Sequence, residues 1–210
     1  PALPAGFDPM PELRGALERH LDVGMEPSLA IRAVYGWRIE WLNALDHDWT
    51  VRNLHRIFPE DDASAPYRQA AWSAYLSMAK NVYPDLLQTE YEFAVDHIGQ
   101  VPYTGPHRDA DPDWRLAEHV AVLYWRGELT LDDEDSLLRR FFANAPARIR
   151  GHALGYLGQQ MFPEEPPVPA EVLERLQVLW QQRLGLAQAA EDKGPFLPEI
   201  TAYGWWFASG

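Results

Sequence analysis

The chain has 210 residues, of which 47% are hydrophobic and 23% charged, a composition typical of a folded protein with a sizeable core. Its formal net charge is −13, from 31 acidic and 18 basic residues, so the chain as a whole repels phosphate backbones and anionic lipid surfaces. The absence of cysteine excludes disulfides, cysteine-ligated zinc and thiol nucleophiles, and it favours a cytoplasmic location. No apolar run approaches the roughly 18 residues that span a membrane, so we expect no transmembrane segment.

Helix signals occur along the whole chain, whereas strand signals are scarce. Asp111-Pro112, for example, has the pattern of an N-cap followed by proline at the first helical position. No convincing alternating run of β-branched residues and no Asn-Gly or Asp-Gly hairpin turn is present. We therefore predict an all-α fold of about ten helices. In chain order they cover residues 9–23, 27–45, 48–58, 65–81, 84–98, 111–127, 133–143, 146–161, 169–188 and 197 onward.

The tripeptide Tyr-Gly-Trp occurs twice, at residues 35–37 and 203–205, which are 168 positions apart. Half of that shift, 84 positions, superimposes Trp41 on Trp125. The 84-residue shift also pairs Leu45 with Leu129, Leu54 with Leu138, Arg56 with Arg140 and Phe58 with Phe142. A fixed shift that matches several positions indicates an internal repeat.

The repeat defines a domain organisation. We predict one helical-repeat domain over residues 1–210, with approximate copies at 27–110 and 111–196 and a truncated third copy at 197–210. The third copy lacks the helix that follows in the first two, so we expect the chain to be a fragment of a longer protein.

An 84-residue unit of four helices equals two helix pairs of about 42 residues, which is the length of HEAT and armadillo units. On this periodicity the chain resembles an α-solenoid of antiparallel HEAT-like helix pairs, and it is similar to helical-repeat regions of large bacterial multidomain proteins. The resemblance implies a non-catalytic protein-binding or scaffolding segment of a larger cytoplasmic protein. Its partner would be another protein or an adjacent domain of the same chain.

The aromatic C-terminal helix is the candidate contact surface. Adjacent tryptophans on a helix point about 100° apart, so both can be buried only if two sides of the helix are covered. We therefore expect an apolar face at the C-terminal end that binds a partner or mediates self-association. The partner-contact candidates are Tyr203, Trp205, Trp206 and Phe207.

Acidic clusters precede several predicted helices. Asp109, Asp111 and Asp113 are spaced like the opening of a calcium loop, but Trp114 and Val120 stand where such a loop needs glycine and glutamate. We expect Asp111 to be an N-cap, and we expect the acidic runs at 60–64 and 131–136 to form turns and caps. No metal or cofactor is therefore predicted.

Glycines at 151, 155 and 158 would line one side of a helix, which favours close helix packing over phosphate binding. The chain has no Gly-x-Ser-x-Gly elbow, Walker loop, dinucleotide fingerprint or His-Glu-x-x-His pattern. These absences favour a protein that is not an enzyme, and we assign no catalytic residue.

Two alternatives stay open. One is an all-α enzyme whose site is assembled from dispersed side chains, with candidates Asp46, His47, His107, Asp109 and Glu118. The other, less favoured because of the net charge of −13, is a solenoid that binds nucleic acid. Its nearest basic cluster is Arg139, Arg140, Arg148 and Arg150.

Overall fold

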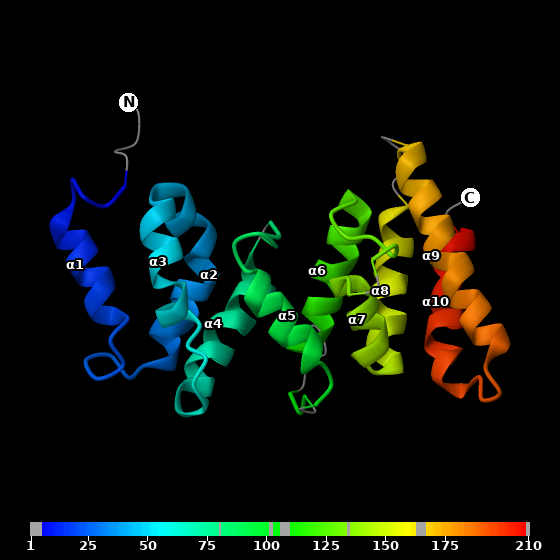
Figure 1. The fold of residues 1–210 in the computed structure, drawn as a ribbon, viewed down its shortest axis with the longest axis horizontal. Coiled ribbons are helices and arrows are strands. Elements are labelled where there is room, and N and C mark those ends of the chain that lie inside the picture. The colour runs from blue at the N-terminus through cyan, green and yellow to red at the C-terminus, as the bar shows by residue number, and fades with distance from the viewer. Residues whose placement is uncertain are drawn as a thin grey trace. The chain divides into compact units, whose positions relative to one another are not determined.

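The protein is described by a computed structural model that covers residues 6–79, 81–100, 103–105, 110–133, 135–162 and 167–208. Ten α-helices occur in this part of the chain, and no strand does (Figure 1). They are α1 (Pro11–His20), α2 (Leu29–Leu45), α3 (His47–Ile57), α4 (Ala65–Met78), α5 (Gln88–Asp96), α6 (Pro112–Arg126), α7 (Leu137–Asn144), α8 (Ala147–Gln160), α9 (Ala170–Ala189) and α10 (Leu197–Ala208). Two short 3₁₀ helices, η1 (Asp62–Ser64) and η3 (Gly194–Phe196), precede α4 and α10. The predicted all-α class is confirmed.

Aspartate side chains cap the first turns of α3 and α6. The Asp46 carboxylate accepts a hydrogen bond from the Trp49 N–H at 2.8 Å, and the Asp111 carboxylate accepts one from the Asp113 N–H at 3.0 Å. Each cap satisfies a backbone donor that the first turn of a helix leaves without a partner. The predicted N-cap role of Asp111 is therefore confirmed.

Within the acidic runs, individual residues form turns and caps. Asp61 accepts from the Ser64 N–H and begins η1. The Asp133 carboxylate accepts from the Asp135 N–H at 3.0 Å, and the cap of α7 is the Ser136 hydroxyl. Because the turn and cap occupy residues up to 136, α7 begins at Leu137, four residues later than the sequence pattern suggests.

The contacts divide the chain into two compact units, Pro1–Glu90 and Tyr91–Gly210. In the first unit α2 packs along α4 and also contacts α3. The Trp49 ring lies edge-on to Phe7 at 5.2 Å, and the Tyr35 hydroxyl donates to the Leu17 carbonyl at 2.7 Å. These contacts join α1, α2 and α3 around a core that includes Ile39 and Ile57.

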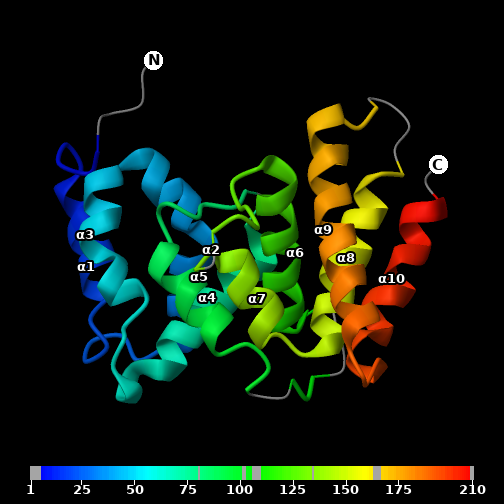
Figure 2. The same ribbon diagram turned by 45° about the vertical axis from the view of Figure 1, so that its right-hand side comes forward.

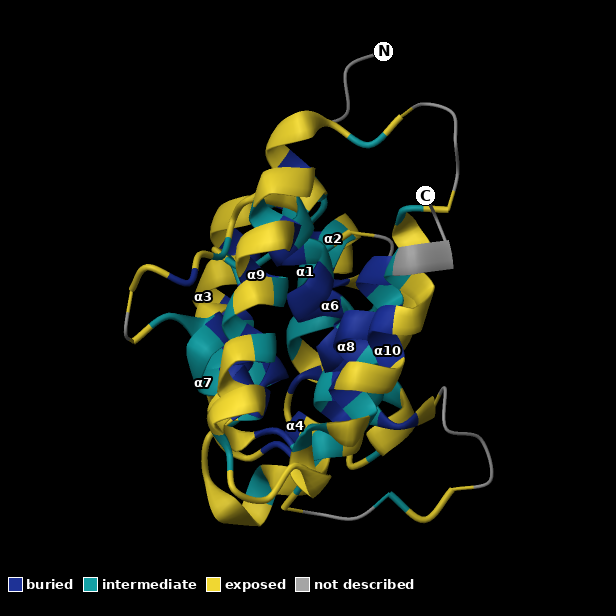
Figure 3. Cartoon of the chain, turned by 90° about the vertical axis from the view of Figure 1, so that its right-hand side faces the viewer, coloured by how far each residue is buried: buried dark blue, intermediate teal, exposed yellow. Residues whose placement is uncertain are grey.

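In the second unit α8 packs between α6 and α10, and α6 also contacts α9. Helices α8, α9 and α10 lie side by side in two views (Figures 1 and 2). Buried residues are concentrated where α6, α8 and α10 meet (Figure 3). The core side chains of this unit include Leu123, Phe141, Leu154 and Leu179.

Alternate helices pack on each other in both units, because α2 packs on α4 and α6 packs on α8. The prediction of a single repeat domain over residues 1–210 stays a prediction.

Candidate binding groove

The three glycines of α8 receive the aromatic helix α10. A Cβ atom added to Gly151 would lie 2.7 Å from the Pro198 carbonyl oxygen, and one added to Gly158 would lie 2.6 Å from Cδ1 of Trp206. At Gly155 the nearest atoms are the Ala202 Cβ at 3.8 Å and Trp205 Cδ1 at 4.0 Å. A larger residue at 151 or 158 would push the two helices apart. The predicted packing role of this glycine row is therefore confirmed.

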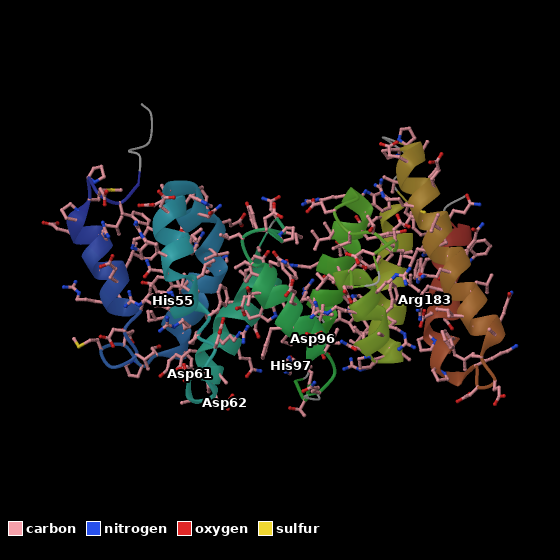
Figure 4. All side chains as sticks on the ribbon, in the orientation of Figure 1. His55, Asp61, Asp62, Asp96, His97 and Arg183 are labelled. Carbon is pink, nitrogen blue, oxygen red and sulfur yellow. The ribbon has the colours of Figure 1, made fainter. Side chains whose placement is uncertain are left out.

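A buried ion cluster fixes the start of α10. Both oxygens of Glu199 accept from Arg183 of α9, at 2.7 and 2.9 Å, and Oε1 also accepts from Arg150 of α8 at 2.6 Å. The Arg183 guanidinium, labelled in Figure 4, also lies 4.5 Å from the centre of the Phe142 ring. Because all three charged groups are largely buried, their hydrogen bonds and cation–π contact replace the water that they lose.

A surface groove of about 520 Å³ opens between α6, α8 and α10. Its walls combine aromatic rings, small residues and a few polar groups, a composition typical of ligand-binding surfaces. It is lined by Trp114, Arg148, Gly151, His152, Gly155, Gln159, Leu197, Pro198, Thr201, Ala202 and Trp205.

One wall of the groove is a stacked pair of rings. Trp114 of α6 and His152 of α8 stack with centroids 3.7 Å apart. The His152 Nε2 lies 3.0 Å from Glu118 Oε1, and Arg115 donates to Glu118 Oε2 at 2.8 Å. Burial raises the pKa of the Glu118 carboxyl, but the hydrogen bonds from His152 and Arg115 outweigh it and leave this pKa below its usual value. Glu118 therefore stays ionised and orients the His152 ring.

The opposite wall is Trp205 of α10. This side chain is 50% exposed, and its ring lies edge-on to Phe162 at 5.8 Å. At the α8 side, Arg148 bonds the buried carboxylate of Asp111 at 3.2 Å while half of its own side chain stays exposed. The groove thus offers two indole rings, a histidine and a partly exposed guanidinium to a bound group.

The four aromatic residues predicted as partner contacts lie in different surroundings. Tyr203 is buried against Trp206 and Trp180, and its hydroxyl has no hydrogen-bond partner among the residues that the structure describes. Trp206 is partly buried, and its Nε1–H donates to the Leu154 carbonyl at 2.8 Å. The side chain of Phe207 lies outside the described residues. Trp205 therefore offers the largest free surface of the three described side chains.

The residues of the alternative catalytic prediction have individual structural roles where they are described. Asp46 accepts from the Phe7 N–H at 2.8 Å in addition to capping α3, and His47 Nδ1 lies 2.9 Å from Asn43 Oδ1. Asp46 and His47 belong to the first compact unit, whereas Glu118 belongs to the second. His107 and Asp109, the first acid of the calcium-like pattern, lie outside the described residues.

Across the described ranges, no group of three or more histidine, aspartate or glutamate residues is placed to hold a metal ion. The basic cluster of the nucleic-acid alternative is largely engaged with acids. Arg140 pairs with Asp96, Arg148 with Asp111 and Arg150 with Glu199. The fourth member, Arg139, donates to the Leu131 carbonyl at 2.5 Å.

A second hollow, of about 240 Å³, lies in the first unit. It is lined by Val51, Leu54, His55, Phe58, Glu60, Leu86, Leu87, Thr89 and Glu90. Its buried carboxylate, Glu90, accepts two hydrogen bonds from Arg68 at 2.8 and 3.0 Å. Burial raises the pKa of Glu90 despite the Arg68 charge. This hollow has fewer exposed aromatic groups than the α6–α8–α10 groove, and its main ionisable group is already paired.

Sequence reasoning did not link Trp114, Arg148 and His152 to a common site. Trp114 lies 34 residues or more before Arg148 and His152 in the sequence, so only helix packing brings Trp114 to His152. The available signal was the glycine row at 151, 155 and 158, which predicts a close helix neighbour but not its identity. The buried hydrogen bond between Tyr91 and His119 Nδ1, at 2.7 Å, was likewise not predicted.

Comparison of the chain with protein-family models, with curated proteins and with solved structures found no match. Among the described residues, none of the helices is both long enough and apolar enough to cross a membrane.

Proposed function

We propose that this chain is a HEAT-like α-solenoid segment of a larger cytoplasmic protein, and that it binds a protein partner through the groove between α6, α8 and α10. The packing of alternate helices supports the architecture. In each unit a helix packs on the next but one along the chain, as α2 does on α4, α6 on α8 and α8 on α10. Stacked helix pairs produce this pattern, and extended repeat surfaces are commonly used to bind proteins.

The observation that carries the binding proposal is the exposed indole of Trp205 opposite the Trp114–His152 stack. Tryptophan is among the residues that most often dominate binding energies, because it buries a large rigid surface at small entropic cost. The groove volume of about 520 Å³ suits an anchor side chain with its flanking backbone. The partner we propose therefore inserts an apolar or aromatic side chain between the two walls.

Charge also restricts the partner. The formal net charge of −13 disfavours nucleic acid and anionic membranes, and most of the arginines near the groove already pair with carboxylates. A protein segment with an apolar anchor and few acidic residues fits these surroundings best.

Site-specific photo-crosslinking tests the proposal. A photoreactive amino acid placed at Thr201, an exposed groove residue, is expected to capture one protein from native cell extract. The same probe at Val178, which is exposed on α9 away from the groove, serves as the matched control. Capture from position 201 alone, reduced at least about fivefold by Trp205→Ala, supports the proposal.

The proposal is wrong if position 201 captures no protein that position 178 does not also capture. Since Trp205→Ala also removes packing against Phe162, its circular dichroism melting curve is compared with that of the parent chain. If the variant is destabilised, Thr201→Arg replaces it, because an arginine at this exposed position blocks the groove without removing a core contact.

A further inference from the structure

The two tryptophans of the α6–α8–α10 groove have indole N–H groups that make no hydrogen bond within the described part of the chain. Two other tryptophans do use this donor, because Trp49 donates to a glutamate at 3.2 Å and Trp206 donates to the Leu154 carbonyl at 2.8 Å. For Trp114 and Trp205 no acceptor is found among the described residues, and the Nε1 of Trp114 is accessible to solvent. A group bound in the groove is therefore free to accept from both.

The ring of Trp205 turns its donor edge toward the groove. Its Cδ1 atom, which is bonded to Nε1 in the indole ring, lies 4.0 Å from the position that a Cβ on Gly155 would occupy. Gly155 lines the groove on the α8 side. The N–H of Trp205 is therefore close to the groove surface, whereas half of the side chain is exposed.

The cationic groups of the groove are compensated by carboxylates outside it. Arg148 bonds Asp111 at 3.2 Å, and His152 Nε2 lies 3.0 Å from a Glu118 oxygen. No acidic residue is among the described residues that line the groove, although the chain has 31 acidic residues. The groove thus presents N–H dipoles with their positive ends outward, and little net charge. Its charge complement is an uncharged apolar group rich in hydrogen-bond acceptors.

The conformation of the bound segment follows from this donor surface. A helical segment uses its carbonyl oxygens internally, so it offers few acceptors. An extended strand presents N–H groups as well as carbonyls and binds at a free sheet edge, and no strand occurs in the described ranges. A polyproline II segment has no internal hydrogen bonds, and its prolines carry carbonyl acceptors without N–H donors. This conformation therefore matches the groove best.

We propose that the groove binds a proline-rich segment of the partner in the polyproline II conformation. Its pyrrolidine rings lie between the Trp114–His152 stack and Trp205, and the two indole N–H groups donate to its backbone carbonyls. Aromatic-lined grooves recognise such segments, whose preformed conformation loses little entropy on binding. The inference rests on the proposed function, since it gives the chemical class of the partner segment that the same groove takes.

Fluorescence anisotropy with labelled decaproline and the purified 210-residue chain, up to millimolar concentrations, tests the proposal. Decaproline is expected to bind saturably. A glycine–serine peptide of the same length and an amphipathic helical peptide, both uncharged, are expected not to bind. Trp205→Phe keeps an aromatic ring but lacks the N–H, so it is expected to weaken binding about threefold to tenfold, the effect of one hydrogen bond.

Trp41→Phe is the matched control, because Trp41 is an exposed tryptophan of α2 in the other compact unit. It is expected to bind decaproline as the parent chain does. Melting curves show whether both variants fold. If Trp205→Phe is destabilised, Thr201→Arg replaces it, because an arginine at this exposed groove position is expected to abolish decaproline binding.

Three results overturn the proposal: no binding of decaproline, equal or tighter binding of either comparison peptide, or equal binding by the Trp205 and Trp41 variants. Photo-crosslinking at Thr201 in extract, with and without excess decaproline, separates this inference from the proposed function. If a protein is captured and decaproline does not reduce the capture, the proposed function stands and the proline-rich class is wrong. If no protein is captured, the proposed function fails on its own, because the peptide titration uses the purified chain and no extract.

Discussion

Arginines in both units bind carbonyl oxygens at the ends of helices. The Arg32 guanidinium, in a residue that is only 1% exposed, donates to the Arg56 carbonyl at the end of α3 and, at 3.1 Å, to the Leu21 carbonyl that follows α1. Burial lowers the pKa of Arg32. Carbonyls at helix C-termini have no partner within the helix and carry a partial negative charge, so they compensate a cation without a carboxylate.

The same arrangement recurs at other helix ends. Arg175 donates to the Trp125 carbonyl of α6 at 2.7 Å, and Arg150 donates to the Ala145 carbonyl after α7 at 2.7 Å. The Arg175 bond joins residues 50 positions apart in the sequence, whereas the Arg150 bond joins the consecutive helices α7 and α8. Among the described residues that are buried, Arg32 donates to carbonyls, whereas Arg68 and Arg183 pair with carboxylates.

Replacing Glu199 with alanine is expected to destabilise the chain by about 3–5 kcal/mol, because it leaves Arg150 and Arg183 partly or fully buried without their shared carboxylate. Urea denaturation measures the loss. Glu174→Ala, at an exposed position of α9, is the control and is expected to change stability by less than about 0.5 kcal/mol. Equal effects of the two substitutions would contradict the proposed role of the ion cluster.

Asp46 gives the chain a pH-dependent contribution to stability. Hydrogen bonds from the Phe7 and Trp49 N–H groups lower the pKa of its carboxyl below the usual value. A depressed folded-state pKa stabilises the protein above the unfolded-state pKa, and this contribution is lost as pH falls through the folded-state value. Asp46→Ala is therefore expected to cost about 1–2 kcal/mol at neutral pH and less in acid.

Chemical denaturation of Asp46→Ala at several pH values between neutral and acidic checks this expectation. Asp48→Ala is the matched control, because Asp48 lies in the first turn of the same helix and is exposed. A difference between the Asp46 variant and the parent chain that stays constant over the whole range would show that the carboxylate is not the source of the effect.

At the scale of whole helices, the two Tyr-Gly-Trp copies have the same sequence but different neighbours. Tyr35 and Tyr203 are both buried, whereas Gly36 packs on α4 and Gly204 faces open space. The Tyr-Gly-Trp motif determines which side of its own helix carries the glycine. The presence of a neighbouring helix decides whether that residue has a packing role.

Alanine at the two glycines should therefore have opposite effects. Gly36→Ala is expected to destabilise the chain by about 1–3 kcal/mol, because the added Cβ overlaps the Ala71 backbone. Gly204→Ala is expected to be neutral or to stabilise by up to about 1 kcal/mol, because alanine favours a helix over glycine. Melting temperatures of the two variants provide the test, and losses of similar size would refute the difference in packing.

At the scale of the whole molecule, the contacts separate two compact units, Pro1–Glu90 and Tyr91–Gly210. Each unit has its own internal contacts, so a local defect in one unit need not weaken the helices of the other. We therefore expect a mutation to increase local unfolding mainly in the unit that contains it.

Hydrogen exchange followed by mass spectrometry measures this response. Gly36→Ala is expected to speed exchange mainly in α2 and α4, and Glu199→Ala mainly in α8, α9 and α10. If both substitutions speed exchange equally throughout the chain, the units unfold together and the prediction fails. The Glu174→Ala variant serves as the control and gives the background rate of hydrogen exchange.

Local sequence signals are sufficient to locate the helices of this protein. All ten predicted segments contain a helix, because the signals that define them are local: apolar residues at helical spacing, proline at the first turn and aspartate or serine before it. The glycine row at 151–158 was also correctly predicted to lie in a close helix contact, since a small-residue stripe suits little else within a helix.

Local signals do not predict which helix packs against the glycine row or which side chains come into contact there. Trp114 and His152 stack, and Glu199 joins two arginines, because α6, α8, α9 and α10 pack together over separations of 16 to 49 residues. Trp205 and Trp206 were both predicted to contact a partner. Trp205 is exposed and Trp206 packs against α8, because adjacent residues point to different sides of α10. Helix formation depends on residues within a few positions of one another. Burial and exposure depend on contacts with residues that are distant in the sequence, and the packing of the whole core determines those contacts.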